Sequence, residues 1–183
     1  MGVPETIFSE RDFRRADFLI FVTVGNHNQP FDRLLKWIDE IALEGIFKEE
    51  FFVQSGYSHH SLKYCSSTDF LRMEDFEIYV KTSSAVITHA GTGSVMMSLR
   101  SGKKPIVIPR LYKFNEHCND HQIGIALEFE KKGLIYVAKN KGDIINQLKA
   151  SLTKNSQVSG YESRNQTLLK IVEQYLDNLF KDT

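Results

Sequence analysis

The sequence predicts an α/β protein whose strands form a doubly wound, mostly parallel sheet of the Rossmann-like kind. Short apolar, β-branched runs alternate along the chain with longer stretches of helical periodicity, which is typical of βαβ units. The apolar runs lack the alternation of strands with one solvent-facing side, so they suit strands buried on both faces. Glycine-containing polar turns follow two of these runs. Together these patterns indicate helices on both sides of one sheet.

The first predicted unit is a strand, a turn and a helix. The strand covers residues 17–24 and ends at Gly25, and the turn 25–30 is polar. A helix follows, because apolar residues then recur at helical spacing: Phe31, Leu34, Leu35, Ile38 and Ile41. A second strand is expected at residues 50–56, with a polar loop at 57–67.

The second predicted unit carries the clearest turn of the chain. An extended piece at residues 69–72 leads into a helix at 73–82, and a strand follows at 85–88. The turn from His89 to Ser94 contains two glycines, two hydroxyl residues and one imidazole, and a helix pattern runs from Val95 to Arg100. A strand that turns into a helix in this way leaves N–H donors at the edge of the sheet.

The last part of the domain repeats the alternation. A strand is predicted at residues 104–110, a polar loop at 111–118, a helix at 119–132, a strand at 134–138 and a helix at 142–152. We therefore expect one domain over residues 17–153.

The two ends of the chain differ from this domain. Residues 1–16 are polar and without clear periodicity, and we expect a loosely ordered extension. After a polar linker, residues 161–180 show a broad apolar helical face. This face would pack on the domain itself or on a partner.

Composition excludes several classes of function. The 183 residues include 23 Lys and Arg and 23 Asp and Glu, so the basic surplus of a nucleic-acid-binding protein is missing. Neither a membrane span nor a signal peptide is evident, and Cys65 and Cys118 suit free thiols in a reducing compartment. We expect a cytoplasmic protein that attaches to membranes only through a partner.

Three polar segments converge on the expected carboxyl edge of the sheet: residues 26–28, 89–94 and 115–122. A helix N-terminus favours an anion, and Thr92 and Ser94 could cap that helix or donate to phosphate oxygens. The set therefore suits a diphosphate joined to a ribose, although an ordinary strand–helix turn would show the same glycine spacing.

Other chemistries fit the same segments less well. His117, Cys118 and His121 would suit zinc only if the helix included His117, and Asn119 and Asp120 argue against that. We therefore expect no metal. The glycine fingerprint of dinucleotide-binding proteins is missing after Gly25, which disfavours NAD.

Six stretches that occur in order resemble a known family. They are Phe21–Gly25, Gln29–Leu34, Val53–Gly56, Ile87–Ser94, Gly102–Arg110 and Glu116–Gln122. Together they resemble the donor-binding half of GT-B glycosyltransferases of family 28, of the MurG and Alg13 type. Within that group they are most similar to bacterial exopolysaccharide subunits of the PssE type.

The resemblance implies a partner and a reaction. In that family the half-enzyme pairs with a membrane-anchored subunit of the PssD or Alg14 type, which holds a lipid-linked saccharide acceptor. The pair would transfer a sugar from a UDP-sugar to a polyprenyl-diphosphate acceptor at the inner face of the membrane. The transfer would proceed with inversion and without an essential metal or another cofactor.

The resemblance also implies roles for particular residues. The diphosphate would lie at the two glycine turns, the uracil against Leu71 and Arg72, and the donor sugar near His121 and Gln122. The expected substrate-binding set is Gly25, Asn26, His27, Leu71, Arg72, His89, Gly91, Thr92, Gly93, Ser94, Glu116, His117, Asp120, His121 and Gln122.

One family feature is missing, since Met97 stands where related sequences carry a ribose-binding Glu. Glu116 is our substitute for that contact. No catalytic base is evident, and the candidates are His89, Glu116 and His117. Arg110 and Lys113 would either favour an acidic sugar or be solvated.

Two rival functions remain open. The chain could be a non-catalytic nucleotide-sugar-binding module that enhances a partner, or a stand-alone nucleotide-binding enzyme. The donor sugar, the linkage and the acceptor are not determined by the sequence.

Overall fold

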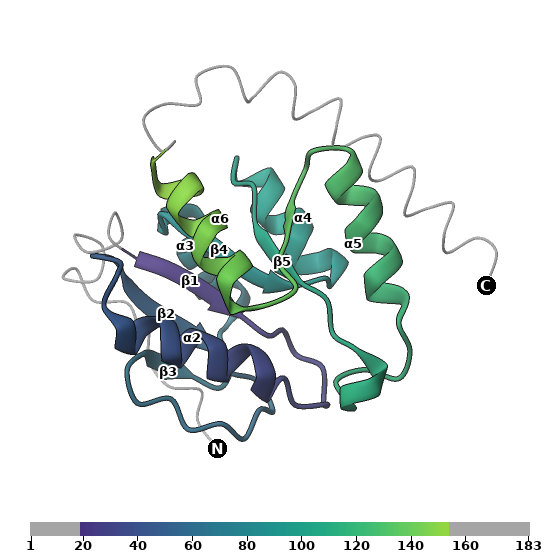
Figure 1. Cartoon of the computed structure of the whole chain (residues 1–183), viewed down its shortest axis with the longest axis horizontal. Helices are drawn as coiled ribbons and strands as arrows, with labels where there is room; N and C mark the ends of the chain where they lie inside the picture. Colours follow the sequence, from purple (N-terminus) through teal and green to yellow (C-terminus); the bar gives the residue numbers. More distant parts are fainter. Residues whose placement is uncertain (1–18, 154–183) are drawn as a thin grey trace.

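The computed structural model describes residues 19–153, which form a single six-stranded sheet flanked by helices (Figure 1). All strand pairs are parallel, and the strands lie in the order β3-β2-β1-β4-β5-β6. The strands are β1 (Leu19–Thr23), β2 (Glu50–Gln54), β3 (Ser66–Thr68), β4 (Ala85–His89), β5 (Ile106–Ile108) and β6 (Tyr136–Val137). The helices are α2 (Asp32–Glu44), α3 (Met73–Thr82), α4 (Thr92–Arg100), α5 (His121–Lys131) and α6 (Lys141–Thr153), with the 3-10 helix η2 at Tyr112–Phe114.

The strand order reverses between β1 and β4, which pair along Ile20–Thr23 and Ala85–Thr88. From β1 the chain moves outward to β2 and β3, and it then returns to β4 and continues outward to β6. A crevice forms at such a switch point because the loops after the two central strands leave the sheet in opposite directions.

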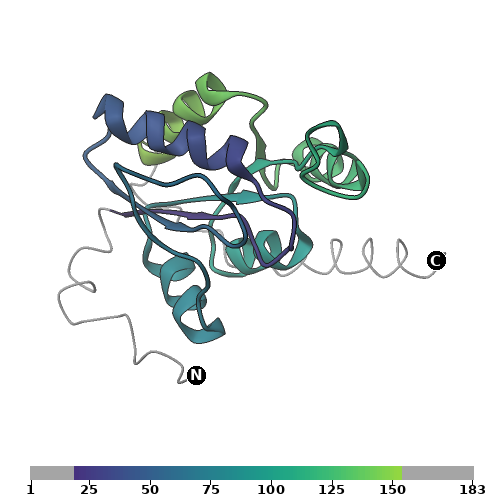
Figure 2. The ribbon, with the colours of Figure 1, turned by 90° about the horizontal axis from the view of Figure 1, so that it is seen from below.

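Helices cover both faces of the sheet. Figure 2 shows α2 and α6 on one side and α3 and α4 on the other. Helix α5 packs with α4 around Val107 and Val137, the buried residues by which the last two strands contribute to this second core cluster. The predicted doubly wound arrangement is confirmed, and the described sheet is entirely rather than mostly parallel.

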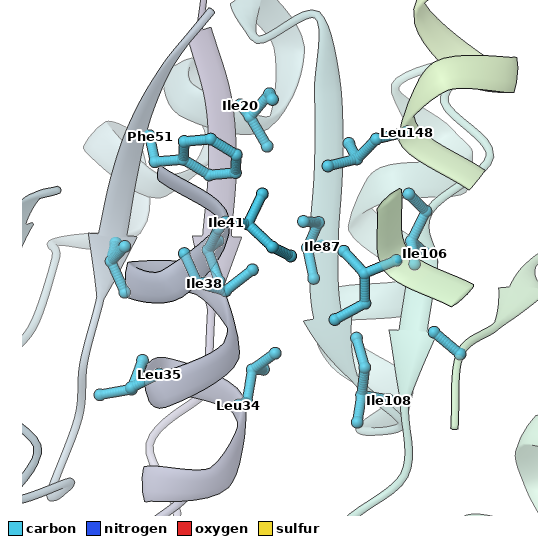
Figure 3. Packing of buried hydrophobic residues seen from close by; sticks show 14 of the residues in the cluster. Ile20, Leu34, Leu35, Ile38, Ile41, Phe51, Ile87, Ile106, Ile108 and Leu148 are labelled. Atoms are coloured by element: carbon cyan, nitrogen blue, oxygen red, sulfur yellow. The ribbon is translucent and has the colours of Figure 1, made fainter. Parts of the chain in front are cut away.

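The largest core cluster lies under α2 and α6 (Figure 3). Helix α2 contributes Leu34, Leu35, Ile38 and Ile41, which recur at helical spacing and are fully buried. They pack against aliphatic side chains of the central strands, including Ile87. On the other face, Phe52 and Tyr79 stack with ring centroids 4.2 Å apart.

Two elements differ from the sequence-based expectation. Strand β3 lies at the end of the segment that was expected to be a loop. It was not predicted because its three residues are polar and exposed or half-buried, so they give no hydrophobic signal. Helix α4 begins at Thr92 rather than Val95. The residues expected in a turn therefore form the first turn of that helix.

The expected N-terminal extension at 1–16 and the C-terminal helix at 161–180 lie outside the described residues. Between Leu19 and Thr153, no helix has the length and apolar character needed to cross a membrane.

Candidate functional site

A cleft of about 530 Å³ opens at the switch point of the sheet. Its walls come from the ends of β1, β2 and β4, the start of α3 and one face of α4. The lining residues are Gly25, Asn26, Gln54, Leu71, Met73, Phe76, His89, Gly91, Gly93, Ser94, Met96, Met97 and Arg100. The cleft thus joins both predicted glycine turns and Leu71.

His89 lies at the centre of the polar end of this cleft. Gly25 and Gly91 approach its imidazole so closely that a Cβ atom on either residue would overlap the ring. Gly25 also has a φ of 75°, a conformation that favours glycine. These two glycines are therefore required by the packing around His89, in addition to any approach of a ligand.

The His89 imidazole is uncharged at neutral pH. Burial is the largest cause that lowers its pKa to about 3, together with the positive charge of Arg110 and the neighbouring His27 and His117. Its Nδ1 atom lies 3.4 Å from the Thr88 hydroxyl oxygen. A neutral imidazole keeps one N–H donor and one acceptor nitrogen, so His89 can donate a hydrogen bond within the cleft but is a poor proton acceptor.

The N-terminus of α4 forms one wall of the cleft. Gly91 is the N-cap residue, and no side chain caps the helix. The expected capping role of Thr92 and Ser94 is therefore wrong, because both lie inside the first turn. The first-turn N–H groups have no partners within the helix, so this end favours an anion.

A hydrogen-bonded chain of side chains orients the turn after β1. The Thr23 hydroxyl donates to Oε1 of Gln54 at 2.9 Å, and Nε2 of Gln54 donates to Oδ1 of Asn26 at 3.0 Å. The Gly25 N–H donates to the Thr23 hydroxyl at 3.1 Å. The amide oxygen of Asn26 is thereby occupied, and its NH₂ group remains for other acceptors. Gln54 was not predicted from the sequence as a site residue, because nothing in the sequence of its strand indicates that its side chain faces a ligand site.

The other end of the cleft is mostly apolar. Leu71, Met73 and Phe76 face Met96 and Met97 across it. Arg72 does not line the cleft: it forms an ion pair with Asp75 at 2.8 Å at the start of α3. Of the two residues expected against the base, the structure brings only Leu71 to the cleft.

Arg110 is fully buried, which contradicts its expected place in solvent or against an acidic sugar. Its guanidinium donates to the carbonyl oxygens of Val24, Gln29 and Glu116 at 2.8–2.9 Å. Burial lowers its pKa to about 10, against the opposing effect of Glu116. Arg110 thus ties the turn after β1 to the loop after β5.

Glu116 is also buried, and it is placed differently from a ribose-binding carboxylate. Its two oxygens accept from Nε and a terminal nitrogen of Arg33 at 2.8 and 2.7 Å, and from the Leu111 N–H at 2.9 Å. The Arg33 guanidinium also lies over the rings of Trp37 and Phe114. Glu116 does not line the cleft, so the structure gives it a role in holding the β5–α5 loop.

The remaining predicted residues do not line the cleft. His27 and His117 have ring centroids 4.7 Å apart, and burial lowers the pKa of His27, as do His117 and Arg110. The Asp120 carboxylate accepts from the Tyr112 N–H, and Oε1 of Gln122 accepts from the Arg110 N–H. His121 is exposed at the first position of α5. Thr92 is half-buried next to the lining residues.

The zinc alternative loses its geometric basis. Helix α5 begins at His121, so His117 precedes the helix and the two histidines share no helical face. Within residues 19–153, no three His, Cys, Asp or Glu side chains gather closely enough to hold a metal ion.

The chain is similar to known glycosyltransferases in both sequence and fold. The family model described as "Glycosyltransferase family 28 C-terminal domain" matches residues 19–177. A curated relative, the UDP-N-acetylglucosamine transferase subunit ALG13 of Yarrowia lipolytica, is 35% identical over 129 residues, which are 64% of this chain and 63% of that protein. The chain therefore spans somewhat less than two thirds of the length of this relative.

Solved structures show the same fold. The NMR structure of ALG13 superposes with a TM-score of 0.51 at 23% identity, covering 84% of this chain and 96% of that one. The structure of MurG from Acinetobacter baumannii superposes with a TM-score of 0.53 at 14% identity, and the match covers 88% of this chain and 52% of MurG. The structure of the glycosyltransferase of kitacinnamycin superposes with a TM-score of 0.58 at 16% identity, and the match covers 85% of this chain and 39% of that one.

Proposed function

Because this chain belongs to the family of glycosyltransferase family 28 C-terminal domains, we propose that it is the donor-binding subunit of a two-component inverting glycosyltransferase. It would move a sugar from a UDP-sugar to a polyprenyl-diphosphate-linked acceptor in the synthesis of an exopolysaccharide or capsule, as PssE-type subunits do. The relative from Yarrowia lipolytica, named as a transferase subunit, supports the two-component part of this proposal.

In this proposal the acceptor is held by a membrane-anchored partner of the PssD or Alg14 type. The chain would then be cytoplasmic and would reach the inner face of the membrane through that partner. The partner would also supply the catalytic base, because two of the three candidates within this chain, His89 and Glu116, are poorly suited. His89 is held neutral by its low pKa, and Glu116 is engaged by Arg33.

The observation that carries the proposal is the junction of two turns at one cleft. The N-terminus of α4, the His89 imidazole and the amide of Asn26 border the same space. A diphosphate placed there would receive hydrogen bonds from the first-turn N–H groups of α4. Those donors would stabilise the negative charge that grows on UDP as the sugar leaves. His121 and Gln122, in the first turn of α5, would lie toward the donor sugar, with His117 nearby.

Calorimetric titration of the purified chain with UDP tests this site, with AMP and NAD as controls. The structure offers a matched pair of variants, since Gly93 and Gly124 are both helical glycines with open space where a Cβ atom would lie. Gly93 lines the cleft and Gly124 does not. We expect Gly93→Val to weaken UDP binding at least tenfold and Gly124→Val to leave it unchanged. Equal affinities for both variants would place the diphosphate elsewhere.

The enhancer alternative requires a different measurement. If the partner alone transfers sugar and this chain merely increases the rate, the chain is an accessory module. We expect the partner alone to be inactive, and transfer to depend on the glycine-turn residues of this chain. Sugar transfer by the isolated partner at a substantial fraction of the rate of the pair would contradict the proposed role.

A further inference from the structure

The cleft wall beyond the phosphate end is formed by one face of α4. Gly93, Met97 and Arg100 follow each other at i, i+4 and i+7, so they lie in a row along that face. Met97 is therefore one helical turn, about 6 Å, from the first-turn N–H groups. A nucleotide whose diphosphate meets the helix N-terminus and whose base enters the apolar end would place its ribose against Met97.

This part of the wall carries no carboxylate. None of the cleft-lining residues within 19–153 is Asp or Glu. The two buried carboxylates on neighbouring elements are already engaged: Asp75 accepts from Arg72, and Glu116 from Arg33. The side-chain amides that line the cleft, those of Asn26 and Gln54, are bonded to each other at the phosphate end.

The lack of a carboxylate has a consequence for specificity. Proteins that read a ribose commonly do so with an Asp or Glu that accepts hydrogen bonds from its hydroxyls. A site built in that way rejects a ligand without the hydroxyl, because its polar group is then left unpaired. Met97 leaves no such group unpaired, and its flexible thioether adapts to either sugar, while Arg100 lies about one turn further along the row.

We propose that the cleft accepts nucleoside diphosphates of 2′-deoxyribose about as well as those of ribose. Donors whose sugar is carried on a deoxyribonucleoside diphosphate are then substrates of the same site. This inference rests on the proposed function, since it takes the cleft to be the nucleotide site.

The first test compares UDP with 2′-deoxy-UDP by calorimetry on the full chain. Because an apolar wall discriminates weakly against the loss or gain of one hydroxyl, we expect the two dissociation constants to differ by less than about tenfold. A preference for UDP of about tenfold or more overturns the inference and leaves the proposed function standing. If neither nucleotide binds, the proposed function itself fails, and the inference fails with it.

A second test builds the missing contact. Met97 is half-buried at the edge of the core cluster around Phe21 and lines the cleft, so Met97→Glu introduces a carboxylate at this wall. We expect this variant to raise the preference for UDP over 2′-deoxy-UDP by about tenfold or more, because only UDP carries a 2′-hydroxyl that can donate to the new carboxylate. Repulsion between the new carboxylate and the diphosphate affects both nucleotides equally, so it cancels in the ratio of the two dissociation constants.

Met97→Leu is the matched control, and it should keep the wild-type ratio. A Met97→Glu protein that folds, binds UDP and shows the wild-type ratio would mean that the ribose does not lie against α4. That result would overturn the inference even if the wild-type protein bound both nucleotides.

Discussion

The imidazole of His89 determines which residues are tolerated at two positions far apart in the sequence. It lies between Gly25, at the end of β1, and Gly91, at the start of α4, and a side chain on either would overlap the ring. From the sequence, both glycines suggest close approach of a ligand. The structure shows that packing against His89 is a sufficient reason for them, while Gly93 has open space and is the glycine available to a ligand.

Gly91→Ala should therefore destabilise the fold through its contact with His89. Gly91 has an ordinary φ of −73°, so backbone strain is not involved. We expect a loss of about 1–3 kcal/mol in the free energy of unfolding, the usual cost of overpacking. In the double variant with His89→Ala the loss should be clearly smaller than the sum of the two single losses, as measured by urea denaturation. Gly93→Ala, with no atom within 4 Å of its Cβ position, serves as the control. Additive losses would disprove the contact.

At the scale of elements, the loop between β5 and α5 is held by charged side chains. Arg110 binds the carbonyl oxygens of the turn after β1, and Glu116 binds Arg33 on α2 and the Leu111 N–H. A loop without its own regular structure is thus fixed to β1 and α2, which border the switch point. Glu116, which was expected at the ribose from the sequence, instead holds this loop in position.

Glu116→Ala separates the anchoring role from the ribose role. Removing the carboxylate leaves Arg33 without its charged partner and the part-buried Leu111 N–H without its acceptor, and we expect the free energy of unfolding to fall by about 3 kcal/mol. UDP affinity at a temperature where the variant is folded should stay within about threefold of wild type. Glu77→Ala removes the carboxylate of an exposed pair with Lys81 and should cost less than about 1 kcal/mol. A stable Glu116→Ala protein with strongly reduced UDP affinity would restore the ribose contact.

Positive and negative charges balance over the whole chain. The sequence has 23 basic and 23 acidic residues, so repulsion between like charges contributes little near neutral pH. Acidification then acts first on groups that the fold holds uncharged. His89 is the clearest of these, with a pKa of about 3, and the pKa of His27 is shifted in the same direction.

The stability of the molecule should therefore fall as the pH is lowered from about 6.5. Unfolded His89 binds a proton near its ordinary pKa while folded His89 does not, so the unfolded state gains protons first. Between pH 6 and 4 this group contributes a slope of at most about 1.4 kcal/mol per pH unit, and the contribution is fully present above pH 6.5. His89→Gln should flatten the profile measured by urea denaturation, whereas His59→Gln, which changes an exposed histidine, should not. Equal slopes for wild type and His89→Gln would contradict the buried neutral state of His89.

Most helices and strands, and the edge of the sheet that carries the candidate site, could be predicted from local patterns in the chain. The apolar runs of β1 and β4 and the periodic face of α2 are local signals, since each depends on residues within one strand or helix. Parallel strands bring their carboxyl ends to one edge, so Gly25 and His89 could be placed together before their contact was known. Strand β3 gave no such signal because it is short, polar and at the edge of the sheet.

Which polar residues face the cleft depends on contacts between distant parts of the chain. Glu116 was expected at the ribose, and Arg110 either at an acidic sugar or in solvent, yet their partners are Arg33, 83 positions away, and Val24, 86 positions away. Gln54 lines the cleft because β2 lies beside β1, where it bonds Asn26. Met97 lines the cleft because that face of α4 is turned toward it. A charged side chain has the same sequence signature whether it is paired inside the fold or exposed to a ligand. The difference lies in which distant groups the fold brings within hydrogen-bonding distance.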